Sequence, residues 1–310
     1  MKIKSDINLY DTLMSGQAFR INIEDDDSFT IIISDRILNI KQENDYIVVN
    51  SNNEEDLELV TRYYLDLDRD YDVLNKELSK NEILKRDINL CKGYKVLKQD
   101  KFEMYISYII SQNNNVKRIA GSINKISERF GKKVKYNNKE YYLFPTFVEL
   151  KNITIEELRE CGVGFRDSYI INALNKLKEN PFFLEELDML PTDEAIKELM
   201  KIKGIGLKVA SCILMFGYSR FDTFPVDTWV KKYVSENFKI KDDIKIISKF
   251  MKDNFKENSG LAVQYFYHIN RNKKQGINWN LFLFVVIFNW QTYVLWNIIK
   301  KERKWTCCWT

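Results

Sequence analysis

The sequence predicts an α+β fold in which an N-terminal domain with an antiparallel β-sheet is followed by an all-helical domain. Between residues 28 and 49, short β-rich runs alternate with acidic or polar turns. From about Glu54 onward, apolar residues such as Leu57, Val60 and Tyr64 recur at helical spacing. Of the 310 residues, 45% are hydrophobic, whereas Pro (4) and Gly (11) are scarce. This composition is typical of a compact folded protein and argues against a disordered scaffold or a repeat array.

The β-rich runs predict a meander of strands at 28–33, 36–40 and 45–49. The helical spacing continues to about residue 271. We expect the domain boundary near residue 90, which gives an N-terminal α+β domain over 1–90 and a helical domain over 91–271. In the second domain the pattern predicts helices at 102–111, 116–130, 155–161, 167–179, 193–200, 207–216 and 226–237.

The C-terminal extension, 272–310, differs from the rest of the chain because its residues 277–299 are largely apolar and carry no charge. That length is sufficient to cross a bilayer. Against a membrane span, several polar side chains are costly in hydrocarbon, among them Asn280, Asn289, Gln291 and Asn297. Three interpretations stay open: a tail anchor, an extra buried or partner-binding helix, or a translated frameshift that replaced a short native C-terminus. Membrane association is expected only through 277–299.

Charge is distributed unevenly along the chain. Residues 1–90 hold 11 Lys and Arg against 20 Asp and Glu, a net charge of −9, while the whole chain is at +4. The later residues therefore carry a net charge of +13. A surface that faces phosphate groups would belong to this later part, although ordinary solvated helix faces would give the same count.

The cysteines are too few and too scattered for a disulfide framework, and His268 is the only histidine, so a Cys/His zinc site is not expected. The N-terminal residues lack the apolar core of a signal peptide. These observations predict a cytoplasmic protein that needs no metal. The five cysteines are Cys91, Cys161, Cys212, Cys307 and Cys308.

The most informative stretch is 202–217, in which two glycines precede an apolar helix. Gly204 and Gly206 permit a tight hairpin between two helices, with its backbone close to a ligand. Exposed amides in such a hairpin and at the following helix N-terminus can bind a DNA phosphate without reading sequence. A bare turn between two helices is the alternative interpretation, and the glycine spacing alone does not exclude it.

Lys208 falls in the first turn of that helix, where the helix dipole disfavours a cation. Together with desolvation in a pocket, the dipole would push the amine toward its neutral, nucleophilic form. Asp227 lies 19 positions later, near the start of a helix whose entry Pro225 fixes. An amine and a carboxylate that converge on one cleft suit the cleavage of a glycosidic bond. The alternatives are a surface lysine that contacts phosphate and an aspartate that only caps its helix.

With these residues, the stretch 199–229 closely resembles the helix-hairpin-helix DNA glycosylases that carry a Gly/Pro-rich loop and a catalytic Asp. Within that superfamily it is similar to the 8-oxoguanine DNA glycosylases, and the resemblance extends over about residues 5–270. It implies that Lys208 is the lysine that forms a Schiff base and Asp227 the catalytic aspartate. It also implies an enzyme that flips the damaged base out of duplex DNA.

The resemblance implies a pocket for the flipped base. In the motif at 15–20, the carbonyl of Gly16 would accept the extra N7 hydrogen of the oxidised base, which guanine lacks. Cys212, one helical turn after Lys208, would pack on the base. In the motif at 260–268 the register is open: the base-reading glutamine of the family aligns with Val263, with Gln264 one position away. An aromatic residue, Phe266 or Tyr267, would stack on the base.

Two further motifs resemble the parts of the family that hold the DNA. In the motif at 113–118, Asn113 would fill the space left by the flipped nucleotide and Arg118 would read the opposite cytosine. In the motif at 162–167, Phe165 would wedge into the base stack and Arg166 would bind the cytosine. A histidine found two positions after the catalytic aspartate in eukaryotic members is replaced by Trp229, which puts that phosphate contact in doubt.

Taken together, the resemblance implies a bifunctional glycosylase and AP lyase in base excision repair. The expected partner is double-stranded DNA that contains 8-oxoguanine opposite cytosine, and no cofactor is needed. We expect a monomer in the cytoplasm, associated with the nucleoid. One alternative is a glycosylase for another damaged base. The other is a non-enzymatic or membrane-tethered helix-hairpin-helix DNA-binding protein. Enzymes for thymine glycol or mismatched adenine usually carry a four-cysteine iron–sulfur loop, whose spacing these cysteines cannot supply.

Overall fold

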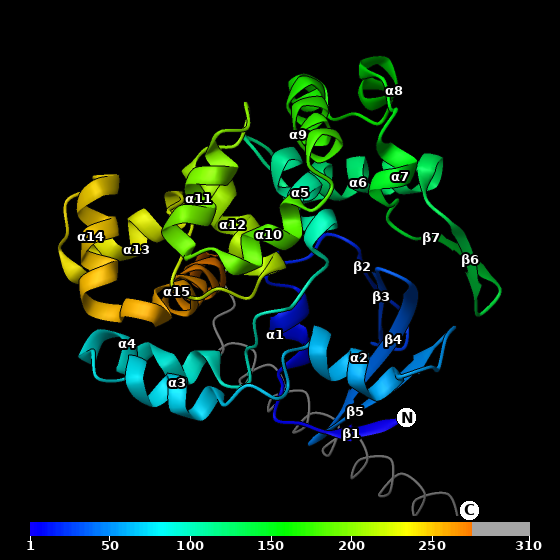
Figure 1. Cartoon of the computed structure of the whole chain (residues 1–310). Helices are drawn as coiled ribbons and strands as arrows, with labels where there is room; N and C mark the ends of the chain where they lie inside the picture. The colour runs from blue at the N-terminus through cyan, green and yellow to red at the C-terminus, as the bar shows by residue number, and fades with distance from the viewer. Residues whose placement is uncertain (275–310) are drawn as a thin grey trace, which may run out of the picture.

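The computed structural model of the protein describes the backbone of residues 1–274 and the side chains of residues 1–270. The three interpretations of 277–299 concern residues outside this range. Within residues 1–274, no helix has the length and apolar character needed to cross a membrane. Figure 1 shows the N-terminal sheet on one side of the molecule and the C-terminal helices on the other.

The sheet has five antiparallel strands in the order β1-β5-β4-β3-β2. Apolar residues of the central strands alternate with others in the sequence, and the structure places Ile31, Leu38 and Ile40 on one buried face of the sheet. The three predicted strands are confirmed as β3, β4 and β5. The short edge strands β1 and β2 were not predicted. The strands are β1 (Lys2–Lys4), β2 (Ile21–Ile23), β3 (Phe29–Ile33), β4 (Arg36–Glu43) and β5 (Tyr46–Ser51).

Two helices, α1 (Leu9–Leu13) and α2 (Leu57–Tyr64), pack against the sheet and share its hydrophobic core. Leu9 and Leu13 of α1 are buried in this core, and the side chain of Asn8 caps the helix. The loop that follows α1 carries Gly16 and leads into β2. The sheet and α1 thus hold this loop from both sides.

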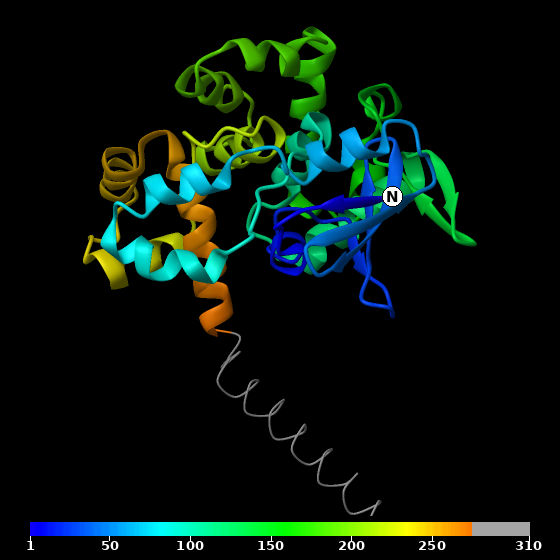
Figure 2. The same cartoon turned by 90° about the horizontal axis from the view of Figure 1, so that it is seen from below.

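The next helices, α3 (Tyr71–Leu78) and α4 (Glu82–Ile88), pack on the C-terminal helices and not on the sheet (Figures 1 and 2). The Tyr233 hydroxyl donates to Asp87 at 2.5 Å, and the Tyr265 hydroxyl donates to Asn75 at 2.7 Å. Apart from Leu97, the core of the sheet ends at Leu65. The domain boundary near residue 90 stays a prediction.

All seven helices predicted between residues 102 and 237 are confirmed, with ends that differ by at most two residues. The helical region is built around one large hydrophobic core, in which α5 contacts both α9 and α12. Its helices are α5 (Lys101–Ile110), α6 (Val116–Phe130), α7 (Phe147–Leu150), α8 (Ile155–Glu160), α9 (Asp167–Glu179), α10 (Phe183–Met189), α11 (Thr192–Met200), α12 (Leu207–Gly217), α13 (Thr228–Phe238), α14 (Ile244–Phe255) and α15 (Ser259–Lys274), with short 3₁₀ turns at Asn89–Cys91, Gly164–Arg166 and Lys256–Asn258.

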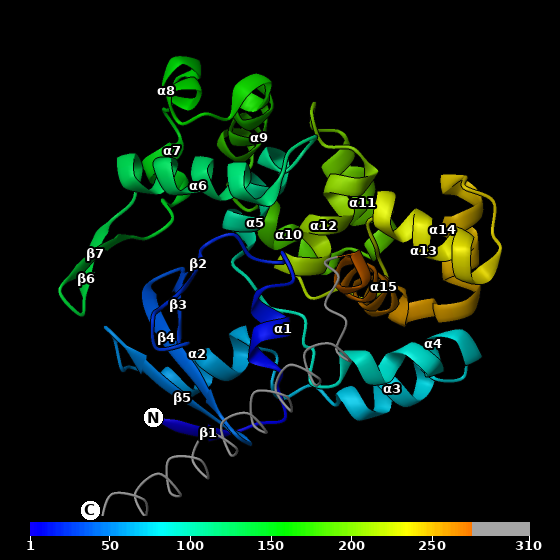
Figure 3. The same ribbon diagram turned by 180° about the vertical axis from the view of Figure 1, so that it is seen from behind.

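The helical region also contains a β-hairpin that the sequence pattern did not predict. Its strands are β6 (Lys133–Tyr136) and β7 (Lys139–Tyr142). The hairpin reaches toward the N-terminal sheet, as Figures 1 and 3 show from opposite sides. The ion pair between Lys139 and Glu24, at 2.7 Å, joins the two.

Candidate active site

A cavity of about 420 Å³ opens between the Gly16 loop, the loop from α5 to α6, and helices α12, α13 and α15. Segments that are far apart in the sequence meet here because α15 packs on α13, and α12 packs on α5. The cavity gathers most of the residues predicted for base binding and catalysis. Those that line it are Gly16, Lys208, Cys212, Asp227, Gln264 and Tyr267.

Lys208 is the second residue of α12, directly after the hairpin that joins α11 to α12. Gly204 adopts a φ of +103°, and a Cβ atom there would lie 2.3 Å from the Tyr169 ring, so only glycine fits this turn. Gly206 is the N-cap of α12. The lysine side chain lines the cavity but is exposed to solvent, so the expected burial of the amine is not observed. Among the residues that the structure describes, no carboxylate lies within 4.0 Å of this amine.

Asp227 both lines the cavity and caps α13. Its Oδ1 accepts hydrogen bonds from the backbone N–H groups of Trp229 at 3.0 Å and Val230 at 2.9 Å. Phe224 and Pro225 are buried and fix the approach of the chain to the helix. The capping interpretation is therefore correct, and it holds the carboxylate at the rim of the cavity with its second oxygen available.

Cys212 lies one turn after Lys208 and is buried at the wall of the cavity. Burial raises the pKa of its thiol to about 12, while the charge of Lys208 lowers the pKa and that of Asp227 raises it. Both charged groups therefore act on the same sulfur. The thiol stays protonated at neutral pH and offers a small apolar surface to an occupant.

On the opposite wall, Gly16 has a φ of +86°, which glycine adopts without strain. The side chain of the next residue, Gln17, holds the loop. Its Nε2 donates to the carbonyls of Lys95 at 2.9 Å and Thr12 at 3.2 Å, and its Oε1 accepts from the N–H of Leu97 at 2.9 Å. Three backbone groups thus fix the position of the Gly16 loop.

Helix α15 places Gln264 and Tyr267, three positions apart, toward the cavity. Val263 and Phe266 do not line it. Phe266 is fully buried and stacks on Tyr233, with ring centroids 4.3 Å apart. The assignment of Val263 and Phe266 to base binding is therefore corrected: both belong to the hydrophobic core, and the helix rotation that buries them presents Gln264 and Tyr267.

The loop from α5 to α6 forms part of the rim of the cavity. Asn113 is exposed and has a φ of +47°, a left-handed conformation that asparagine tolerates. Asn115 caps α6 by accepting from the N–H of Arg118 at 3.0 Å. The Arg118 side chain is exposed on the same rim.

Phe165 and Arg166 lie next to this loop in different environments. The Phe165 ring is 56% exposed, although it contacts the edge of Tyr169 at 6.0 Å between centroids. Arg166 is 4% exposed and donates to the backbone carbonyls of Gln112, Asn113 and Val163. Its guanidinium is thus committed to the loop, and the expectation that it faces the opposite base is not met in this structure.

The predicted DNA-contacting segments form one connected surface. Gly204 packs on Tyr169, Tyr169 contacts Phe165, and Arg166 holds Asn113. The hairpin, the 162–166 turn and the 112–115 loop are therefore joined by direct contacts beside the cavity. Burial lowers the pKa of the Arg166 guanidinium, and the charge of Arg118 lowers it further.

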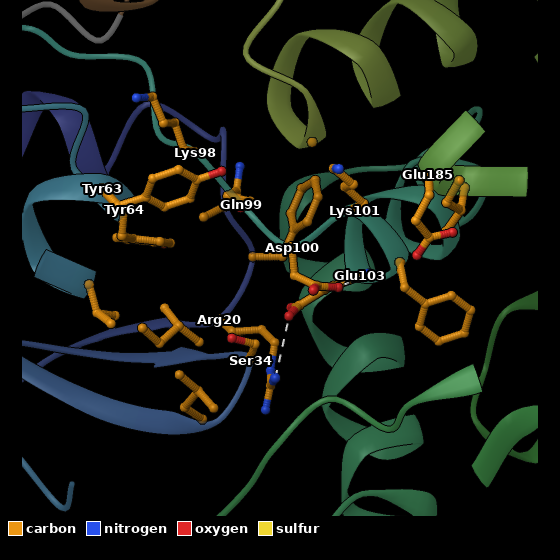
Figure 4. A pocket seen from close by; sticks show the side chains of 18 residues that line it. Arg20, Ser34, Tyr63, Tyr64, Lys98, Gln99, Asp100, Lys101, Glu103 and Glu185 are labelled. Carbon is orange, nitrogen blue, oxygen red and sulfur yellow. Dashed lines mark hydrogen bonds and ion pairs between the residues drawn. The ribbon is translucent and has the colours of Figure 1, made fainter. Parts of the chain in front are cut away.

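The structure also contains a second large cavity, of about 340 Å³, where the sheet meets α5 and α10 (Figure 4). A buried ion pair between Arg20 and Glu103, at 3.8 Å, lies in its wall. None of the residues predicted for catalysis lines this cavity, so it lies apart from the candidate active site. Among the described residues, no group of three or more His, Cys, Asp or Glu side chains is arranged to hold a metal ion.

Other residues of the first cavity carried no signal in the sequence. Tyr108 and Phe216 line it as a stacked pair, with ring centroids 5.3 Å apart. Aromatic residues on apolar helices are common in protein cores, so only the tertiary structure distinguishes these from the core.

Two family models match the chain. Residues 1–105 match the N-terminal domain of 8-oxoguanine DNA glycosylase, and residues 106–256 match the HhH-GPD superfamily of base excision DNA repair proteins. The structure of an 8-oxoguanine glycosylase/lyase from Clostridium acetobutylicum, in complex with DNA that contains cytosine opposite 8-oxoguanine, is similar with a TM-score of 0.83 and 34% identity. That similarity covers 88% of this chain and 98% of the other.

Among curated relatives, the N-glycosylase/DNA lyase OGG1 of Arabidopsis thaliana is 32% identical over 155 residues, which are 49% of this chain and 42% of that protein. The N-glycosylase/DNA lyase of Saccharomyces cerevisiae is 28% identical over 270 residues, which are 76% of this chain and 70% of that protein. The alignment thus spans less than half of the Arabidopsis protein.

The fold and the cavity define a member of the HhH-GPD superfamily of base excision DNA repair proteins. Within that superfamily, the chain belongs to the 8-oxoguanine DNA glycosylase family. The predicted fold, a sheet domain followed by a helix-hairpin-helix domain, is confirmed.

Proposed function

We propose that this protein is a bifunctional DNA glycosylase and AP lyase that excises 8-oxoguanine opposite cytosine from duplex DNA. The observation that supports this most is that Lys208 and Asp227, which lie on different helices, line one cavity next to the Gly16 loop. An amine and a carboxylate at one site are the pair that nucleophilic cleavage of an N-glycosidic bond requires. The relatives named N-glycosylase/DNA lyase support the same activity.

The proposed reaction begins when a flipped nucleotide enters the cavity. The amine of Lys208 attacks C1′ of the deoxyribose, and the bond from C1′ to the base breaks, with its electron pair leaving on the base. The carboxylate of Asp227 stabilises the positive charge that develops on the sugar. Loss of a proton from the amine and opening of the sugar ring give a Schiff base, from which β-elimination cleaves the strand on the 3′ side.

Base recognition is proposed for the walls of the cavity. The carbonyl of Gly16 accepts the N7 hydrogen that 8-oxoguanine carries and guanine lacks. Cys212 packs on one face of the base, and Tyr267 stacks on the other. Gln264 binds the edge of the base that normally pairs.

The connected surface beside the cavity is proposed to hold the duplex. The amides at Gly204 and Gly206 bind a phosphate, Phe165 wedges into the stack, and Asn113 fills the space of the flipped nucleotide. Arg118 reads the opposite cytosine. Arg166 acts through the loop that it holds. We further propose that the protein works as a monomer, without a cofactor, in the cytoplasm and on the nucleoid.

Borohydride trapping tests this function. With a duplex that contains 8-oxoguanine opposite cytosine, the protein should form a covalent adduct with DNA, because borohydride reduces the Schiff base. Lys208→Gln should abolish the adduct. The control Lys201→Gln changes an exposed lysine that pairs with Glu198 on the other side of the hairpin, and it should leave the adduct unchanged. An adduct of normal yield in Lys208→Gln would refute the assignment.

Duplexes with other damaged bases distinguish the remaining candidates. Excision of alkylated purines at the rate of 8-oxoguanine would place the protein among glycosylases of broader specificity. DNA binding without excision of any lesion would indicate a binding protein that has lost the reaction.

A further inference from the structure

A buried tyrosine connects the two walls of the candidate active site. Tyr94 is 1% exposed and lies between the Gly16 loop and α15. Its hydroxyl is 3.3 Å from Nε2 of Gln17 and 3.3 Å from Oε1 of Gln264. The ring is held by an edge contact with Tyr265, at 5.9 Å between centroids, and by His268 at 5.0 Å.

The direction of these hydrogen bonds follows from the surroundings of Gln17. The Nε2 of Gln17 faces two backbone carbonyls, and its Oε1 faces the N–H of Leu97. The amide of Gln17 therefore has only one acceptable orientation, with its N–H groups toward the Tyr94 oxygen. Because the amide nitrogen of Gln17 cannot accept a hydrogen bond, the Tyr94 hydroxyl does not donate to it, and the hydrogen of the hydroxyl is available for another partner.

The orientation of Gln264 then follows from Tyr94. Because the Tyr94 hydroxyl donates, it selects the amide oxygen of Gln264 as its partner. The NH₂ group of Gln264 lies on the other side, where Nε2 is 3.8 Å from the sulfur of Met215. An amide nitrogen has two hydrogens, so one N–H of Gln264, a residue that lines the cavity, remains beyond the contact with Met215.

We propose that Tyr94 is a positioning residue that sets base specificity, because it fixes Gln264 with an N–H donor toward the cavity. This inference rests on the proposed function. A donor at that point complements a carbonyl group at C6 of a purine and opposes an amino group there. 8-Oxoguanine and 8-oxoadenine share the N7 hydrogen that the Gly16 carbonyl would read, and they differ on the pairing edge, where C6 carries a carbonyl group in the first base and an amino group in the second. Gln264, held by Tyr94, therefore selects 8-oxoguanine over 8-oxoadenine.

Tyr94→Phe removes only the hydroxyl and frees the amide of Gln264 to turn over. Single-turnover excision of the two lesions, each opposite cytosine, should show that the preference for 8-oxoguanine falls about tenfold, the effect of one buried hydrogen bond. The matched control is Tyr105→Phe, which removes another buried hydroxyl, one that donates to the Ala173 carbonyl at 3.1 Å away from the cavity. The control should keep the wild-type preference.

A second variant shows whether Tyr94 acts through Gln264. In a Gln264→Leu background, Tyr94→Phe should cause no further change in preference. A third measurement uses the unaltered protein and a duplex whose lesion has hydrogen in place of the C6 oxygen. Excision of this analogue should be about tenfold slower than that of 8-oxoguanine in the wild type, and the difference should disappear in Gln264→Leu.

Three results would overturn the inference. The first is an unchanged preference for 8-oxoguanine in Tyr94→Phe, and the second is an equal loss of preference on Tyr94→Phe in the wild-type and Gln264→Leu backgrounds. The third is excision of the analogue without the C6 oxygen by the wild type at the same rate as 8-oxoguanine. A wild-type protein that excises no 8-oxoguanine would instead refute the proposed function. The two failures are therefore distinguishable.

Discussion

Asp227 caps α13 and is also proposed to act in catalysis, and a single substitution can separate the two roles. Its carboxylate caps α13 through two backbone N–H groups, and the same carboxylate faces the cavity with Lys208. Asparagine caps helices as well as aspartate does but carries no charge. The structural role therefore survives in Asp227→Asn, whereas the electrostatic role does not.

We expect Asp227→Asn to lower the single-turnover excision rate roughly 100- to 1,000-fold, the usual effect of losing one preorganised charge or donor. The free energy of unfolding should change by less than about 0.5 kcal/mol, because the cap is kept. The control is Asp243→Asn, since Asp243 caps α14 in the same way, with N–H groups at 2.8 and 3.1 Å. Normal excision by Asp227→Asn would show that the residue is only a cap.

At the scale of the element, Arg166 holds the loop from α5 to α6, and the exposed Arg118 does not. Arg166→Ala leaves the carbonyls of Gln112, Asn113 and Val163 without their donor. We expect the free energy of unfolding to fall by about 1–3 kcal/mol. Arg118→Ala should change it by less than about 0.5 kcal/mol. Urea unfolding of both variants measures the difference.

Both arginine variants should also show a weaker preference for cytosine opposite the lesion, for different reasons. Arg118→Ala removes the group proposed to read the cytosine, whereas Arg166→Ala releases the loop that carries Asn113. Excision rates opposite each of the four bases test this. Equal rates opposite all four bases in the unaltered protein would contradict it.

The hairpin before α12 offers a matched pair of substitutions. In Gly204→Ser the new Cβ would meet the Tyr169 ring at 2.3 Å in a left-handed backbone, and we expect a loss of about 2 kcal/mol or more in the free energy of unfolding. In Gly206→Ser the Cβ meets no atom within 4 Å, and serine is a good N-cap. Thermal unfolding should therefore show little change for Gly206→Ser. Similar losses in both variants would contradict the special role of Gly204.

The elements also show which features a sequence pattern can reveal. Strands β3 to β5 and helices α6 and α12 could be predicted because their own residues alternate or recur with the right period. The three-residue strands β1 and β2 could not, because pairing with β5 and β3, not their own pattern, makes them strands.

Site prediction had the same limit. Gly16, Lys208 and Asp227 belong to local motifs, so the sequence could single them out, and the structure places them at one cavity. The rotation of α15, which decides between Phe266 and Tyr267, is set by packing on α13. Tyr94 could not be found at all, because its importance lies in contacts with residues 77 and 170 positions away.

At the scale of the whole molecule, the Arg20–Glu103 pair joins the sheet domain to the helical core. Arg20 directly precedes β2, Glu103 belongs to α5, and Arg20 also donates to the Tyr142 carbonyl on β7. Burial raises the pKa of Glu103 to about 7, although the charge of Arg20 lowers it. Unfolding would expose this carboxyl to water and return its pKa to the ordinary value of 4.5.

This shift predicts how stability depends on pH. A carboxyl whose pKa is higher in the folded protein favours the fold below pH 4.5, and this contribution is lost as the pH rises toward 7. The free energy of unfolding of Glu103→Gln, relative to that of the wild type, should therefore increase as the pH rises from 4.5 to 7, by an amount of the order of 1–3 kcal/mol. Above pH 7 this difference should stay constant. Urea unfolding at several pH values measures it.

The control for the pH series is Glu140→Gln. Glu140 is exposed, and its hydrogen bond with Lys133 lowers the pKa of its carboxyl, so its substitution should have a small effect of the opposite sign below pH 4.5 and a nearly constant effect between pH 4.5 and 7. A flat difference between Glu103→Gln and the wild type across this range would contradict the assigned pKa.

The solvent exposure of Lys208 has a consequence for the proposed reaction. Without DNA, the amine of Lys208, the proposed nucleophile, is in contact with bulk water. On the proposed function, only an everted nucleotide with its flanking strand would seal the chamber. Undamaged duplex met during a search would leave the chamber unsealed. On this proposal, a damaged nucleotide completes the site by shielding the amine from water, and the site stays incomplete on undamaged DNA.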